Sequence, residues 1–171
     1  MNVSPRKEPA RVLFAGGGTG GHLMPGAALA TALEDILPGA RALFLATQRD
    51  AERHCRGALA RFQVLEIPVA RWTGAMQKAR FCLRSPAAAV RTLEVLRGFR
   101  PHAVVALGGY SCVVPALVAR ALALPVMVLE SNAMPVRVVR SLAPLVDCVQ
   151  LQWAEAAQHL RARRCVVTGN P

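Results

Sequence analysis

Short apolar runs alternate along the chain with longer stretches in which apolar residues recur at helical spacing. The short runs predict buried strands over residues 11–15, 42–46, 64–67, 103–107, 126–129, 148–151 and 165–168. The longer stretches predict helices over residues 24–37, 50–61, 85–99, 113–122, 135–142 and 154–163. Continuously apolar strands separated by helices are typical of a parallel sheet covered on both faces. The fold class is therefore predicted to be α/β, a Rossmann-like doubly wound parallel sheet with strand order 3-2-1-4-5.

A glycine-rich loop follows the first predicted strand and leads directly into a helix. Its sequence is Gly16-Gly17-Gly18-Thr19-Gly20-Gly21, and His22 comes next. Glycines allow a close backbone approach, and a helix N-terminus attracts anions, so the loop suits a diphosphate. A tight turn without a ligand is the alternative. His22 is a candidate general base, or else a turn residue that only hydrogen-bonds locally.

A second glycine loop, Leu107-Gly108-Gly109-Tyr110-Ser111, follows the fourth strand. In the predicted strand order the first and fourth strands are neighbours at the topological switch point, where ligands bind. Two such loops facing one crevice are more specific than either alone, although a structural turn remains the alternative for the second. The fifth strand ends at Glu130 and Asn132, which place a carboxylate and an amide beside this crevice. The alternative is that Ser131 or Asn132 caps the helix that follows Pro135.

Composition narrows the class of partner only partly. The net charge of +11 over 171 residues favours a polyanion: nucleic acid, an anionic membrane or a phosphate-bearing substrate. An arginine-rich genome would explain part of the same excess. Aromatic residues make up only 5% of the chain, which disfavours base stacking on nucleic acid. The five cysteines form no C-x-x-C pair, so reduced thiols in a cytosolic protein are the simplest explanation.

Together these motifs resemble the MurG family of GT-B glycosyltransferases, which complete lipid II. The matching segments are Gly17 to His22 with Pro25, Gly108-Gly109-Tyr110, Glu130 to Pro135, and Gly169-Asn170-Pro171. They follow the family's order and span nearly the whole chain. The sequence departs from the family near the crevice. The family has His, Gln, Gly and Asn where this chain has Leu129, Ser131, Val136 and Val139. After Tyr110 the family has Ser and Pro where this chain has Cys112 and Val114.

The resemblance implies both an architecture and a reaction. Residues 11–171 would form the N-terminal half of a GT-B fold after a flexible segment at 1–10, with the C-terminal donor domain absent. N-acetylglucosamine would pass, with inversion, from its substrate UDP-N-acetylglucosamine to lipid I. Neither a cofactor nor a metal is implied. His22 matches the family's proposed base. The implied donor contacts are Thr19, Gly20, Gly21 and Asn132, and the implied acceptor contacts are Gly17, Gly18, Gly108, Gly109, Tyr110, Ser111 and Glu130.

The family also meets the cytoplasmic membrane through an apolar patch with a basic rim. The corresponding apolar residues here would be Trp72, Met76, Phe81 and Leu83, and the basic ones Arg71, Lys78, Arg80 and Arg84. An amphipathic core segment with a solvated basic face is the alternative. The resemblance thus implies a cytoplasmic, peripheral protein. Its expected partners are lipid I, an anionic membrane surface and a donor domain in cis or in trans, but no nucleic acid.

Without a donor domain, the chain alone is expected to bind UDP-N-acetylglucosamine poorly and to be inactive. Two other functions stay open at this point. One is a non-catalytic module that binds a lipid diphosphate or a membrane. The other is one subunit of a split glycosyltransferase, which the polar start of the chain disfavours, because such membrane subunits usually begin with a transmembrane anchor.

Overall fold

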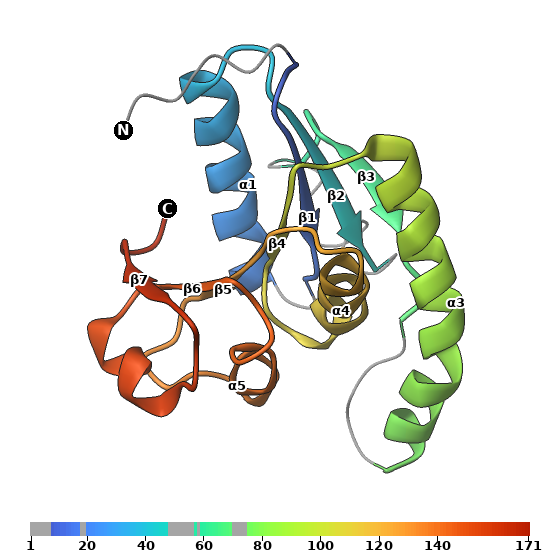
Figure 1. Cartoon of the computed structure of the whole chain (residues 1–171), viewed down its shortest axis with the longest axis vertical. Helices are drawn as coiled ribbons and strands as arrows, with labels where there is room; N and C mark the ends of the chain where they lie inside the picture. The colour runs from blue at the N-terminus through green and yellow to red at the C-terminus, as the bar shows by residue number, and fades with distance from the viewer. Residues whose placement is uncertain (1–7, 18–19, 48–56, 58, 70–74) are drawn as a thin grey trace.

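A parallel β-sheet runs through the molecule, with helices on both of its faces (Figure 1). The computed structural model describes residues 8–17, 20–47, 57, 59–69 and 75–171. Within them the strands are β1 (Arg11–Ala15), β2 (Arg41–Ala46), β3 (Gln63–Glu66), β4 (Ala103–Ala106), β5 (Val126–Glu130), β6 (Cys148–Leu151) and β7 (Cys165–Val167). Their order is β3-β2-β1-β4-β5-β6-β7, and every pair is parallel. The predicted fold class and the predicted order of the first five strands are confirmed.

More of the described helices pack against one face of the sheet than against the other. The described helices are α1 (Gly20–Ile36), α3 (Ala75–Phe99), α4 (Val113–Ala121) and α5 (Arg137–Leu142), with short 3-10 segments η1 (Tyr110–Cys112) and η2 (Ala154–His159). In Figure 1, α1 lies on one side of the sheet, and α3 and α4 lie on the other. The apolar strands predicted this two-sided burial, because a strand with only one buried face would alternate between apolar and polar residues.

Successive residues of β1 belong to two separate cores. Leu13 and Ala15 face the core built with α3 and α4, whereas Phe14 faces the core beneath α1. The Phe14 ring stacks on the Phe44 ring with 4.9 Å between centroids, and both side chains are almost fully buried. Burial of β1 on both faces fixes its register, because a one-residue slip would exchange the two cores. The end of β1, where the first glycine loop begins, is therefore firmly placed.

Helix α3 is longer than the sequence predicts. The helix was expected to begin at Ser85-Pro86, but it begins at Ala75 and continues through Pro86. Proline has no N–H to bond the carbonyl four residues earlier, so it weakens the helix locally without having to end it. The Ser85 hydroxyl donates to the Phe81 carbonyl at 2.8 Å, which links the turns on either side. The helix is held because Phe81, Ala88 and Val95, seven residues apart, all enter the same core.

Three other predicted helices also differ from the structure. Helix α1 begins at Gly20, inside the glycine loop, four residues before the predicted start. The helix predicted over residues 154–163 is only the 3-10 segment η2. Most of the helix predicted over residues 50–61 lies outside the described residues, and residues 59–61 form a turn.

Candidate active site at the carboxyl ends of β1, β4 and β5

The two glycine loops touch each other directly. They leave the carboxyl ends of β1 and β4, which are neighbours in the sheet. A Cβ atom at Gly109 would overlap the carbonyl oxygen of Gly17, and one at Gly16 would lie 2.7 Å from the Cβ of Cys112. All three glycines have positive φ, a region that other residues adopt only at a cost. The loops therefore form one wall, as the strand order predicts. Close packing between the loops by itself requires glycine at these positions, whether or not a ligand binds there.

His22 lies in the first turn of α1 and is half-buried. Its imidazole contacts the second loop: a Cβ atom at Gly108 would lie 2.8 Å from His22 Cδ2 and 3.2 Å from His22 Nε2. The same Cβ would be 3.6 Å from the Leu129 carbonyl oxygen, at the end of β5. Gly108 therefore lies where α1, the second loop and β5 meet. Residues 20 and 21 form the start of α1, whereas Gly18 and Thr19 lie outside the described residues.

The remainder of the second loop turns inward. Tyr110, Ser111 and Cys112 form η1, and the last two are fully buried. The Cys112 thiol donates to the Gly109 carbonyl at 3.2 Å, and burial raises the pKa of this thiol to about 12. The Ser111 hydroxyl is buried and has no hydrogen-bond partner among the residues that the structure describes. In this conformation the acceptor contact predicted for Ser111 would have to come from its backbone, not from its hydroxyl.

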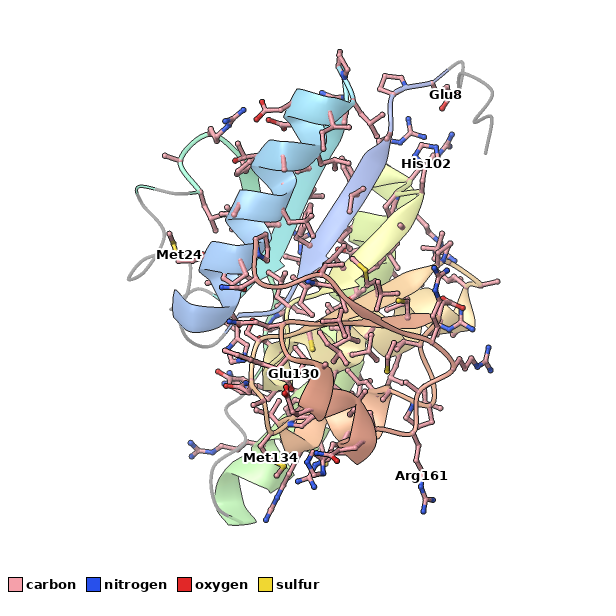
Figure 2. The ribbon with its side chains drawn as sticks, turned by 90° about the vertical axis from the view of Figure 1, so that its left-hand side faces the viewer. Glu8, Met24, His102, Glu130, Met134 and Arg161 are labelled. Carbon is pink, nitrogen blue, oxygen red and sulfur yellow. The ribbon has the colours of Figure 1, made fainter. Side chains whose placement is uncertain are left out.

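A buried carboxylate organises the loop after β5. Glu130 is only 3% exposed, and its oxygens accept three hydrogen bonds. Asn132 donates its backbone N–H at 2.9 Å and its Nδ2 at 2.7 Å to Oε1, and Val136 donates its backbone N–H at 2.9 Å to Oε2. Figure 2 shows Glu130 inside the molecule, beneath the N-terminal end of α1. This geometry argues against the direct acceptor contact predicted for Glu130, while Asn132 stays exposed beside the crevice.

The predicted membrane patch needs correction at one residue. Phe81 is 7% exposed and packs in the core, so its ring is not available to a membrane. Arg80 and Arg84 are exposed, whereas Arg71, Trp72 and the side chains of Met76 and Lys78 lie outside the described residues. Leu83, which was also expected in this patch, is exposed, and it belongs to an apolar stripe on the outer face of α3 that continues with Pro86, Ala87 and Val90. Its spacing of three, four and seven residues was a readable signal, but the helix was expected to start too late for the stripe to be recognised.

Two further features bear on the class of site. Among the residues that the structure describes, no group of three or more His, Cys, Asp or Glu side chains could hold a metal ion. None of the described helices is long and apolar enough to cross a bilayer. Among the described residues, the side chains at the three strand ends include the His22 imidazole, the Asn132 amide and the buried Glu130 carboxylate, and the first turn of α1 lies beside them.

Comparisons with known proteins agree on one family. A family model of the Glycosyltransferase family 28 N-terminal domain matches residues 12–150. Two bacterial proteins named UDP-N-acetylglucosamine--N-acetylmuramyl-(pentapeptide) pyrophosphoryl-undecaprenol N-acetylglucosamine transferase are similar over 94% of this chain. The one from Syntrophus aciditrophicus is 32% identical, and the matched region is 45% of its length. The one from Anaeromyxobacter sp. is 35% identical, and the matched region is 42% of its length.

Solved structures of related proteins share the fold of this chain. The crystal structure of Acinetobacter baumannii MurG superposes with a TM-score of 0.78 at 25% identity, covering 95% of this chain and 46% of that one. A UDP-N-acetylglucosamine 2-epimerase superposes with a TM-score of 0.67 at 14% identity, which is a likeness of fold alone. The chain thus spans less than half the length of the curated relatives that it matches.

Proposed function

The chain belongs to the Glycosyltransferase family 28 N-terminal domain family, and on this premise we propose that it is the acceptor-binding half of a lipid II-forming transferase. The complete enzyme would transfer N-acetylglucosamine from UDP-N-acetylglucosamine to lipid I. The membership confirms the resemblance to the MurG family. The donor half would be supplied by a second domain, in cis or in trans.

The contact of His22 with Gly108 is the observation that carries this proposal. It places the His22 imidazole, in the first turn of α1, against the second glycine loop at the topological switch point between β1 and β4. Backbone N–H groups at the start of α1 favour an anion such as the acceptor diphosphate. An imidazole beside them suits a general base, because it can take up a proton near neutral pH.

The proposed reaction is a single displacement. The 4-hydroxyl oxygen of the muramoyl sugar bonds to the anomeric carbon of N-acetylglucosamine, and the bond from that carbon to UDP breaks. The hydroxyl proton passes to the imidazole of His22. Because attack and departure occur on opposite sides of the carbon, the configuration inverts. His22 is the residue of this chain that takes the proton.

Complementation with a donor domain tests the proposal. We expect the 171-residue chain to show no transfer alone, and to transfer N-acetylglucosamine to lipid I when joined to the C-terminal half of the Syntrophus relative. His22→Ala should then lower kcat by about 10²–10⁴-fold, the usual contribution of a general base. His159→Ala is the matched control, since His159 is exposed on η2. Full activity in His22→Ala, or no transfer by any joined enzyme, would contradict the proposal.

We also propose that the outer face of α3 meets an anionic membrane. Its apolar stripe adjoins Arg80 and Arg84, and each basic side chain near such a surface contributes about 1 kcal/mol. Replacing both arginines by alanine should weaken binding to phosphatidylglycerol vesicles by roughly 30-fold in co-sedimentation. Leu83→Asp should also weaken binding, because Leu83 is 81% exposed. Ile36→Asp, at a site 75% exposed on α1, is the control. If it weakened vesicle binding as much as Leu83→Asp does, the outer face of α3 would not be the membrane-binding surface.

A further inference from the structure

The last described strand of the sheet is short and lies at its edge. Strand β7 consists of three residues, and within the described part of the chain it pairs with β6 alone. One more backbone bond follows, from the Thr168 N–H to the Leu151 carbonyl at 3.1 Å. A short edge strand with few hydrogen bonds opens easily, so this ladder holds the end of β7 only weakly. The direction in which the chain leaves the sheet therefore depends on further contacts.

Gln150, on β6, supplies such contacts. Its Nε2 donates a hydrogen bond to the Gly169 carbonyl at 2.8 Å and another to the Thr168 hydroxyl. A side-chain amide has two N–H groups, so these two bonds use both of them. Gln150 is half-buried, which partly shields the bonds from water. Gln150, Thr168 and Gly169 thus form a clamp, which extends the hold of β6 to two residues beyond β7.

Gly169 has a backbone conformation that favours glycine. Its φ is +79°, and a Cβ atom added there would meet no other atom within 4 Å. Glycine at this position is therefore explained by the conformation of the backbone and not by a lack of space. In this conformation the Gly169 carbonyl accepts the hydrogen bond from Gln150. The clamp thus holds a defined turn of the chain directly before Asn170.

We infer that Gln150 is a positioning residue, which sets the direction in which the chain leaves this half of the enzyme and thereby the orientation of the donor half. This inference rests on the proposed function, with the donor half joined after Pro171. A defined exit from the sheet limits the orientations that a joined domain can adopt, and so raises the fraction in which the bound donor faces His22. Gln150 acts in this way without touching either substrate.

Kinetics on the chain joined to a donor domain test this role. Gln150→Leu removes both N–H donors and should lower kcat about fivefold, which corresponds to about 1 kcal/mol. KM for lipid I and the inhibition constant of UDP should stay unchanged, because each half keeps its own binding site. Gln158→Leu, on exposed η2, is the matched control and should leave kcat unchanged. An unchanged kcat in Gln150→Leu, an equal loss in Gln158→Leu, or a rise in KM for lipid I alone would overturn the positioning role.

Two variants on the other side of the clamp test whether its members act together. Thr168→Val removes one acceptor and should lower kcat about twofold alone, but should add nothing to Gln150→Leu. Gly169→Ala disfavours the positive φ and should also lower kcat. Gly39→Ala, at φ of +85° between α1 and β2, is its control and should leave kcat unchanged. Additive losses in the double variant, or equal losses in the two glycine variants, would overturn the clamp.

A readout on the 171-residue chain alone distinguishes failure of this inference from failure of the proposed function. In ¹³C-resolved NMR spectra, Gln150→Leu should shift the carbonyl resonance of Gly169, since its hydrogen-bond donor is lost, and Gln158→Leu should leave it in place. An unmoved resonance in Gln150→Leu would overturn the clamp, whatever the activity of the joined enzyme. A shifted resonance together with no transfer by any joined enzyme would overturn the proposed function, and with it the positioning role, but would leave the contact between Gln150 and Gly169 standing.

Discussion

Replacing Gly108 by alanine would test the contact between the second glycine loop and His22. The new Cβ would lie 2.8 Å from Cδ2 and 3.2 Å from Nε2 of the imidazole. Both distances are shorter than ordinary contact, so the ring must move or the loop must shift. Gly108 also has φ of +82°, where a side chain costs about 1–2 kcal/mol. Overpacking adds about 1–3 kcal/mol, giving a loss of about 2–5 kcal/mol in the free energy of unfolding.

Gly39→Ala is a control that measures the cost of a positive φ without a steric clash. Gly39 has φ of +85°, and its nearest neighbour, Pro9 Cβ, would be 3.9 Å from the added atom. This variant should therefore lose only about 1–2 kcal/mol, the cost of the positive φ. The difference between the two variants measures the displacement of His22 and its surroundings. Urea unfolding of the 171-residue chain, followed by circular dichroism, gives both values.

Histidine NMR completes the assay. The chain has four histidines, and a His22→Gln variant identifies the resonances of His22. Gly108→Ala should shift the His22 ring resonances, and Gly39→Ala should leave them in place. Equal destabilisation by the two alanines, with unmoved His22 resonances in both, would refute the idea that Gly108 positions this ring.

Four further predictions concern the stability and reactivity of the domain. Exposed Cys82 should react with iodoacetamide at neutral pH while buried Cys112 stays unmodified in the folded chain, as read by mass spectrometry. Since burial raises the pKa of Cys112 from 9.0 to about 12, the unfolded chain loses this proton first. Stability should therefore fall between about pH 9 and 12 more steeply in the wild type than in Cys112→Ala. Asp147→Ala removes acceptors for Arg120 at 2.9 Å and the backbone N–H of Val126 at 2.8 Å, and should cost about 1–3 kcal/mol in urea unfolding. Phe44→Ala should cost about 3–5 kcal/mol in the same assay, whereas a loss below 1 kcal/mol would contradict the packing beneath α1.

The strand order was predictable because it depends on the hydrophobicity of whole segments and not on single residues. Strands that are apolar throughout require cover on both faces, and few topologies provide it. Helix boundaries depend on single residues and were predicted less well. Ser85-Pro86 is a common start for a helix, but Phe81 continues the seven-residue spacing of Ala88 and Val95 toward the core. Burial of that ring outweighs the hydrogen bond lost at Pro86, so α3 continues through it.

The role of Glu130 could not be read from its position at the end of a strand. Any carboxylate there is a candidate ligand for sugar hydroxyls, and the sequence does not show where its hydrogen bonds go. The loop after β5 folds back so that Asn132 and Val136 direct their N–H groups at this one carboxylate. Such a pairing depends on the local path of the backbone, which residue types alone do not determine. A similar limit applied to Ser111, whose hydroxyl turns into the interior.

The contacts at the three strand ends indicate a site whose shape is set largely by packing within the domain. Gly17 and Gly109 leave no space between the two loops, Gly108 contacts the His22 ring, and Glu130 holds Asn132. Each contact lies within this domain, so none requires a substrate to form. A site that is already ordered avoids the entropic cost of fixing side chains when a ligand binds. The glycines of this chain would then serve the proposed reaction in two ways, by exposing backbone N–H groups and by letting the loops pack against His22, the proposed base. Because these two roles fall on different glycines, alanine at Gly108 should impair the position of His22 more than the attraction for an anion, which depends on the start of α1.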